Sequence, residues 1–225
     1  MTVEDILDRL RSQSNPDNVA GMSRYGINPD GALGIPIPVL RRLAREIGVD
    51  HSLALALYDT GVHEATILAA MIDDPLQVTE RQMEKWARAF DSWDVCDQVC
   101  NNLFCRTPLA LRKVYEWTQR NEIFVKRAGF VLIAQLAVHD KRLDNRTFRG
   151  YLAIIERESS DARNFVTKAV NWALRQVGKR NPALNKAAVK TAKRIKASDA
   201  RCARWIASVA LRELRSDKVL ERLKK

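Results

Sequence analysis

Apolar residues recur at helical spacing along almost the whole chain, and residues that start helices precede the apolar runs. Thr79-Glu-Arg-Gln82 has the form of a capping box ahead of the apolar Met83 and Trp86. Asp50 and Asn181 are suited to helix N-caps, and Asn181 precedes a proline at the first helical position. Few stretches show the strict alternation of a β-strand. The pattern therefore predicts an all-α protein.

A short motif repeats within this helical pattern. Phe124-Val-Lys-Arg-Ala128 returns 41 residues later as Phe165-Val-Thr-Lys-Ala169, and weaker copies begin at Val62 and Ala200. A period of about 40 residues with paired helices is typical of HEAT-like repeats, which stack to bury their apolar faces. We therefore predict a HEAT-like repeat α-solenoid, a curved superhelix of antiparallel helix pairs, in a single domain over residues 1–225. The segment 28–38, rich in Gly and Pro, is interpreted as a loop between the first helices.

The repeat predicts a basic surface. Arg127 and Lys168 occupy the same position in the two copies, so we expect them side by side on one surface. Lys168, Trp172 and Arg175 follow at i, i+4 and i+7, which places them along one helix face. Such a stripe is typical of a track for phosphates. The alternative, in which Trp172 is core and the charges are merely solvated, stays open.

Charge is unevenly distributed along the chain. The formal net charge is +11, and residues 168–225 hold 17 Lys or Arg against 4 Asp or Glu, whereas the preceding residues hold 21 against 23. A basic surplus confined to the C-terminal third favours a nucleic-acid partner over a set of solvated helix faces. We expect a nucleic acid as that partner, with no membrane and no obligate protein partner.

Composition indicates an ordinary globular protein. Hydrophobic residues make up 46% of the chain, and no apolar run approaches the roughly 18 residues of a membrane span. The beginning of the chain is unlike a secretory signal, so we expect a cytoplasmic, nucleoid-associated protein. The four cysteines lack disulfide or zinc spacing and are expected to be small buried residues. Trp86, Trp117 and Trp205 are expected in the core.

Several chemistries lack their motifs in this chain. None of the three histidines has nucleophile or metal spacing, and no phosphate-binding glycine loop occurs. Asp91, Asp94 and Asp97 stand at i, i+3 and i+6, which drift around a helix instead of converging as a nuclease metal site requires. We therefore expect neither a metal nor another cofactor.

One pair of residues permits a different chemistry. Trp93 and Asp97 are four residues apart, which puts an indole and a carboxylate on the same helix face. Cleavage of an N-glycosidic bond builds positive charge on the sugar, and a carboxylate near C1′ stabilises that charge and orients an attacking water. An indole packs against the sugar and favours its cationic form.

These segments resemble a known family. Ser92-Trp-Asp-Val-Cys-Asp97, Lys126-Arg-Ala128 and Lys168-Ala-Val-Asn-Trp-Ala-Leu-Arg175 are similar to the matching segments of AlkD-type DNA alkylation repair glycosylases, and Tyr25 resembles a further position. The resemblance implies a HEAT-like monofunctional glycosylase that excises cationic N3- or N7-alkylated purines without a metal, with double-stranded DNA that carries alkylated bases as its partner. It implies that Asp97 is the catalytic carboxylate and that Trp93 and Trp172 are aromatic walls. The DNA-binding residues it implies are Tyr25, Lys126, Arg127, Lys168 and Arg175.

The sequence departs from that family in one respect that bears on activity. Familiar members have two tryptophans before the first aspartate of the motif, whereas this chain has Ser92-Trp93, and Cys96 replaces a small aliphatic residue. Two other hypotheses therefore remain open. One is a non-catalytic DNA-structure-binding protein of the same fold, and the other is a HEAT-type protein-interaction scaffold.

Overall fold

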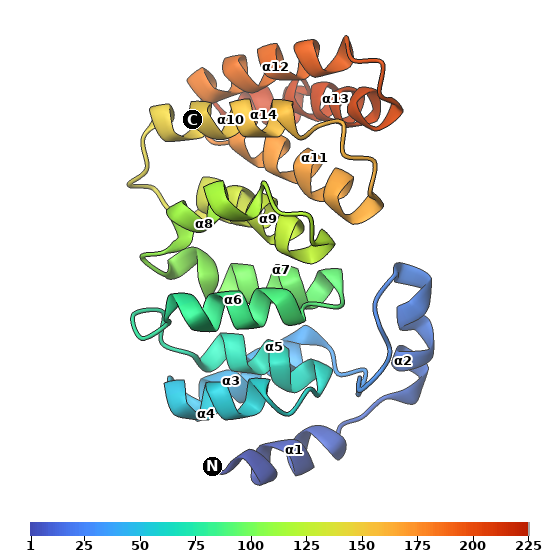
Figure 1. The fold of residues 1–225 in the computed structure, drawn as a ribbon, viewed down its shortest axis with the longest axis vertical. Coiled ribbons are helices and arrows are strands. Elements are labelled where there is room, and N and C mark those ends of the chain that lie inside the picture. The colour runs from blue at the N-terminus through green and yellow to red at the C-terminus, as the bar shows by residue number, and fades with distance from the viewer. Residues whose placement is uncertain (225) are drawn as a thin grey trace. The chain divides into compact units, whose positions relative to one another are not determined.

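The computed structural model describes residues 1–224, and these residues form helices joined by short connections, with no strand among them. Figure 1 shows these helices, coloured from blue at the N-terminus to red at the C-terminus. The α-helices are α1 (Val3–Arg11), α2 (Pro16–Met22), α3 (Ile37–Ile47), α4 (His51–Tyr58), α5 (His63–Ile72), α6 (Glu80–Ala89), α7 (Trp93–Asn102), α8 (Ala110–Trp117), α9 (Ile123–His139), α10 (Asn145–Arg157), α11 (Asn164–Gly178), α12 (Pro182–Lys196), α13 (Arg201–Leu214) and α14 (Asp217–Arg222). Two 3-10 turns, η1 (Ser23–Tyr25) and η2 (Phe104–Arg106), complete the elements. The all-α prediction is confirmed.

The predicted helix starts are largely those of the structure. The side chain of Asp50 accepts a hydrogen bond from the Leu53 amide at 2.9 Å, and that of Asn181 accepts one from the Leu184 amide at 2.9 Å. Thr79 accepts from the Gln82 amide at 3.2 Å, whereas the Gln82 side chain donates to Asp73 at 2.6 Å. These side chains satisfy amides that the first helical turn leaves without partners.

The chain divides into two compact units, residues 1–110 and a second unit that begins at Leu111. In the first unit, α5 is the central helix and packs against α3, α4 and α7. Nearly all of α5 is buried, from His63 to Ala70. The rings of Tyr58, at the end of α4, and Trp86, in α6, stack with 3.9 Å between their centroids and 6° between their planes. This unit therefore has a core of its own.

The loop over residues 28–38 is held in place by α5. Glu64, only 2% exposed, accepts hydrogen bonds from the amides of Leu33 at 2.8 Å and Ile35 at 3.1 Å. Gly34 has φ +74°, and a Cβ there would lie 2.3 Å from the Asn15 carbonyl oxygen. Only glycine fits this close approach. The structure agrees with the predicted loop up to Pro36, whereas Ile37 and Pro38 are the first residues of α3. A buried carboxylate supplies the anchor of the loop.

In the second unit, α9 and α11 form the largest helix contact, and α13 packs against α11 and α12. Residues 125–137 of α9 are buried all round. Phe124 and Phe165, which begin the two copies of the sequence repeat, have ring centroids 5.4 Å apart. Repeat-equivalent positions are thus spatial neighbours, as the 41-residue period predicts.

The tryptophans differ from the sequence expectation at one position. Trp86 and Trp117 are buried, at 1% and 0% exposure, as expected. Trp205 is 45% exposed, so its assignment to the core was wrong. It lies on the first turns of α13, at a position of the helix that neighbouring elements leave open to solvent.

Candidate nucleic-acid interface

The first unit holds Trp93 and Asp97 on α7. Trp93 is the first residue of the helix and Asp97 the fifth, and both side chains are half-buried. The indole Nε1 of Trp93 donates a hydrogen bond to the main-chain carbonyl oxygen of Tyr25 at 2.9 Å. Tyr25 itself is 74% exposed. Two of the predicted site residues, Trp93 and Tyr25, are therefore in direct contact, and Asp97 lies one turn further along the same helix.

Two cysteines lie under this segment of α7. Cys96 and Cys100 are both fully buried. Burial raises the pKa of the Cys100 thiol, and Cys96 and the nearby carboxylate of Asp97 raise it further. Both cysteines are therefore buried packing residues, as expected. Cys105 and Cys202 are partly exposed, contrary to the same expectation.

Ser92 has a role that the sequence did not indicate. It occupies the N-cap position of α7 but makes no side-chain cap; its hydroxyl donates to Asp94 Oδ1 at 2.5 Å. Asp94 Oδ2 lies 2.8 Å from His63 Nε2, at 7% exposure of the histidine. A buried chain of three side chains thus joins α5 to α7. Its polar groups are mutually satisfied, so Ser92 supports the helix that carries Trp93.

The His63–Asp94 pair shifts the titration of both groups. Burial opposes the charged form of His63, but the hydrogen bond and charge of Asp94 outweigh it and raise the pKa of the imidazole. Burial likewise acts against ionised Asp94, and the bonds from His63 and Ser92 outweigh it, so the pKa of Asp94 is lowered. The pair is therefore stabilised in its charged form.

The second unit holds the predicted basic stripe on α11. Lys168 is exposed, and Trp172 and Arg175 are partly exposed. Arg175 pairs with Glu213 of α13, which also binds Lys179 at 2.6 Å. The side chain of Trp172 is thus partly covered and partly exposed to solvent. Lys168 is the more exposed of the two cations of the stripe.

Arg127 and Lys126 lie differently from the expectation of a surface track. Arg127 is 5% exposed, and its Nη1 donates to the carbonyl oxygen of Phe165 at 2.7 Å. Lys126 is 8% exposed and lies 2.7 Å from Glu158 and 3.0 Å from Asp161. Arg127 does reach the start of α11, but it does not share an exposed surface with Lys168. The reason is that the side chains of Lys126 and Arg127 point inward, to partners in neighbouring segments.

Trp205 is the interface candidate that sequence reasoning missed. With Lys168 and Arg201 it lines a surface cavity of about 350 Å³ in the second unit. Trp205 is the fifth residue of α13, just as Lys168 is the fifth of α11 and Arg127 the fifth of α9. The sequence repeat gave no signal for this, because a copy that begins at Ala200 places Ala203 opposite Lys168, and only the observed helix starts relate Trp205 to these cations. An exposed indole between cations is a typical platform for a nucleobase or sugar.

Comparison with known proteins decides the family. The profile of the DNA alkylation repair enzyme family matches residues 6–214. The chain belongs to this family. No curated protein matches it.

A solved structure gives independent support for the fold of this DNA alkylation repair family member. It is described as a new family of proteins related to the HEAT-like repeat DNA glycosylases with affinity for branched DNA structures. The two chains are 19% identical, with a TM-score of 0.77, over 86% of this chain and 83% of the other. The HEAT-like fold is thus confirmed.

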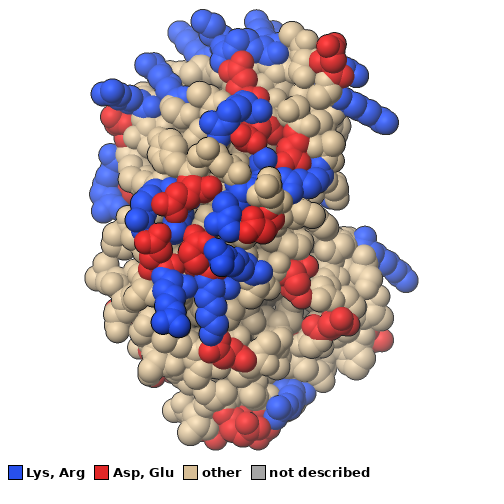
Figure 2. Space-filling view, viewed as in Figure 1, with Lys and Arg blue, Asp and Glu red and all other residues tan. Residues whose placement is uncertain are grey.

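Surface charge in the second unit agrees with a nucleic-acid partner. Lys and Arg gather over α12, in the upper part of the space-filling view (Figure 2). The last turn of that helix alone carries Lys193, Arg194 and Lys196. Arg194 is paired with Glu156 at 2.6 Å, while Lys193 and Lys196 are exposed. No helix in the described part of the chain has the length and apolar character to cross a membrane.

Proposed function

We propose that this protein is a monofunctional DNA glycosylase that hydrolyses the N-glycosidic bond of cationic N3- or N7-alkylated purines in double-stranded DNA. The observation that carries the proposal is the placement of Trp93 and Asp97 on one face of α7, with the indole held by the Tyr25 carbonyl. Membership of the DNA alkylation repair enzyme family supports it.

Hydrolysis of this N-glycosidic bond requires the protein to supply a negative charge and a surface that fits the sugar. As the C1′–N bond breaks, the electron pair leaves with the purine, and positive charge develops on the deoxyribose. Asp97 would stabilise that charge and orient the water that attacks C1′, while the face of Trp93 packs against the sugar. An alkylated purine is already cationic and leaves as a neutral base, so a strong general acid is unnecessary.

Other residues would hold the DNA. We assign Lys168 and Arg175 to phosphates, Trp172 to the second aromatic wall, and the exposed Tyr25 to the DNA surface. Lys126 and Arg127 are better suited to positioning, since their contacts with Glu158, Asp161 and the Phe165 carbonyl hold the segment that leads into α11. Trp205 is added to the aromatic contacts.

The test is base release from DNA that carries 3-methyladenine or 7-methylguanine. Asp97→Asn removes the charge at nearly constant size, so we expect excision to fall by about 100-fold or more while DNA binding is kept or slightly tightened. Asp91→Asn is the matched control, because Asp91 is an exposed carboxylate of the same segment that pairs with Asn28 at 2.6 Å. If Asp97→Asn leaves the excision rate unchanged, Asp97 is not the catalytic carboxylate.

A second candidate function is DNA-structure binding without excision. Two observations favour it: Ser92 stands where family members have a tryptophan, and the protein of the similar solved structure has affinity for branched DNA. It predicts tight, salt-sensitive binding with no base release by the wild-type protein on either lesion. Binding that is insensitive to salt would instead favour a protein-interaction scaffold.

A further inference from the structure

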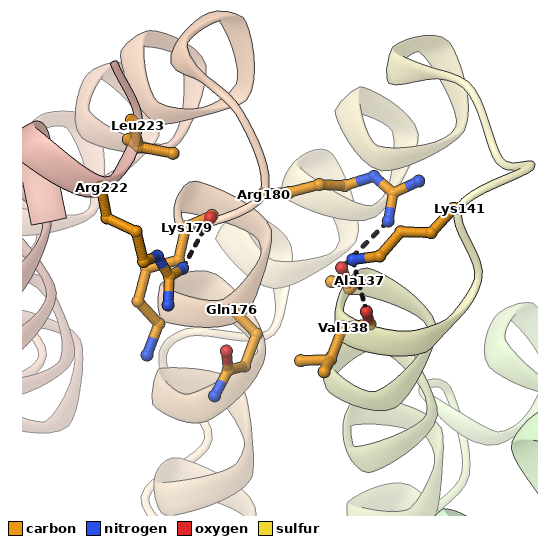
Figure 3. Close-up of a pocket in the computed structure, with 8 residues that line it drawn as sticks. All are labelled: Ala137, Val138, Lys141, Gln176, Lys179, Arg180, Arg222 and Leu223. Carbon is orange, nitrogen blue, oxygen red and sulfur yellow. Dashed lines mark hydrogen bonds between the residues drawn. The ribbon is translucent and has the colours of Figure 1, made fainter. Parts of the chain in front are cut away.

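A second basic feature lies at the other end of α11 from Lys168. A cavity of about 540 Å³ opens between the C-terminal ends of α9 and α11 and the end of α14. Four of its lining side chains are cationic, namely Lys141, Lys179, Arg180 and Arg222 (Figure 3). They come from three separate segments of the second unit. Neither the proposed excision chemistry nor the Lys168 stripe uses this cavity.

Arg180 forms the fixed part of the cavity. Its guanidinium donates to the carbonyl oxygens of Ala137 at 3.0 Å and Leu143 at 2.9 Å, and lies 4.5 Å from the ring centre of Phe148. These contacts hold it between the two helix ends, as Figure 3 shows for Ala137. A guanidinium has five N–H donors, so this geometry leaves donors for a further acceptor.

The other cations are only lightly engaged. Lys141 donates to the Val138 carbonyl at 2.7 Å, and Arg222 to the Lys179 carbonyl at 2.9 Å. Lys141 and Arg222 are both exposed. Each retains N–H donors, since an ammonium has three and a guanidinium five.

The two carboxylates near the cavity are already paired, one of them partly with the cavity's own Lys179. Glu213 is shared between Lys179 and Arg175, and Asp140 is bound by Arg142 at 2.9 Å. Cations at helix C-termini also serve as caps, which accounts for Arg180 and Lys141. Arg222 reaches in from α14 and bonds the carbonyl of Lys179, the C-cap residue of α11, which brings a further charge to that helix end. The cavity is therefore lined by four cationic side chains and by no carboxylate.

We propose that this cavity binds a backbone phosphate of a second DNA duplex segment, such as the second arm of a branched DNA. The inference rests on the proposed DNA-binding function and names a further substrate class for it. Lys168 and Lys179 are eleven residues apart, which at 1.5 Å per residue is about 16 Å along the helix. This separation exceeds the width of the B-DNA major groove, about 12 Å, so Lys168 and the cavity would contact different phosphates.

The experiment compares a four-way DNA junction with a linear duplex of the same total length, using Lys141→Glu/Arg222→Glu. These positions are exposed, whereas Arg180 and Lys179 support the fold through internal contacts. We expect the wild-type protein to bind the junction more tightly than the duplex. The double variant should lose about tenfold or more in junction affinity, with little loss on duplex, and its junction salt slope should fall by about 2.

The matched control is Arg146→Glu/Arg149→Glu, which makes the same charge change at two exposed positions of α10 outside the cavity. Equal losses on junction and duplex, equal losses in the control, or a wild-type protein without junction preference would each overturn the proposal. Thermal stabilisation by inorganic phosphate that the double variant loses, with junction affinity unchanged, would assign the cavity to a free phosphate instead. Base release is measured separately, so its absence would reject the glycosylase and leave the junction result intact.

Discussion

The indole Nε1 of Trp93 donates a hydrogen bond of 2.9 Å to the main-chain carbonyl oxygen of Tyr25, a residue 68 positions earlier. This bond ties the first turn of α7 to η1 and fixes the rotation of the indole. Asp97, one turn further along α7, thus has an aromatic neighbour of defined orientation. Orientation of this kind is what packing against a sugar requires.

The variant Trp93→Phe tests the contribution of the indole hydrogen bond separately from that of the aromatic ring. The variant keeps an aromatic face but loses the donor to Tyr25, so we expect a stability loss of about 1 kcal/mol and roughly tenfold slower excision. Single-turnover base release and thermal unfolding measure the two effects. Trp93→Ala should be slower again, and wild-type excision by Trp93→Phe would show that the bond does not orient the ring for catalysis.

The His63–Asp94 pair should give stability a defined pH window. The raised pKa of His63 means that its contribution is complete below about pH 6.5 and is lost as pH rises through the folded-state value. The lowered pKa of Asp94 means that its contribution is complete above about pH 4 and is lost as pH falls through its folded-state value.

His63→Gln should therefore lower the free energy of unfolding by about 1–3 kcal/mol near pH 5.5 and by less near pH 8. Urea unfolding of wild type and variant at the two pH values measures this difference. The same loss at both pH values would mean that His63 is not protonated in the folded protein. Ser92→Ala is the companion variant, since it weakens the same chain without removing a titrating group.

Two lysines of similar sequence context should behave oppositely. Lys126→Met breaks the buried pairs with Glu158 and Asp161, and we expect a loss of about 1–3 kcal/mol in stability. Lys168→Met removes an exposed cation, so stability should be unchanged while DNA affinity falls and the salt slope decreases by about 1. Chemical unfolding and binding at several salt concentrations test both. Reversed behaviour of the two variants would contradict the assignment.

The exposed Trp205 should contribute stacking energy to DNA binding. We expect Trp205→Ala to weaken binding of DNA with unpaired bases by about 1–3 kcal/mol, and Trp205→Phe to retain most of the affinity. Fluorescence anisotropy with a labelled oligonucleotide measures the change. Leu220→Ala, at an apolar side chain with 39% exposure, is the control for loss of surface. An equal effect of both alanine variants would argue against stacking.

Much of the fold was predictable because its signals are local. The N-caps Asp50 and Asn181 and the repeat that begins at Phe124 and Phe165 are all visible in short stretches of sequence. The structure places them as expected, since capping involves residues three apart. The burial of a single tryptophan was not predictable in this way. Nothing in the residues around Trp117 and Trp205 distinguished a buried from an exposed side chain, and only the packing of neighbouring helices determines which one is covered.

The candidate site was predictable to the same extent. A spacing of four residues is enough to put Trp93 and Asp97 on one face of a helix. The Ser92–Asp94–His63 chain was not predictable, because it joins α5 to α7 across about 30 residues of sequence. Ser92 occupies the N-cap position of α7, but its side chain bonds Asp94 and so serves the contact between two helices.

The amino-acid sequence by itself determined the helices, the repeat and the presence of an acid beside an indole, since helical periodicity and capping act over a few residues. Only the tertiary structure decided which charges face solvent. Lys126 and Arg127 are drawn inward by Glu158, Asp161 and the Phe165 carbonyl, whereas Lys168 stays exposed. The physical reason is that a charge is buried only where partners from distant segments replace its hydration, and packing alone brings those partners together.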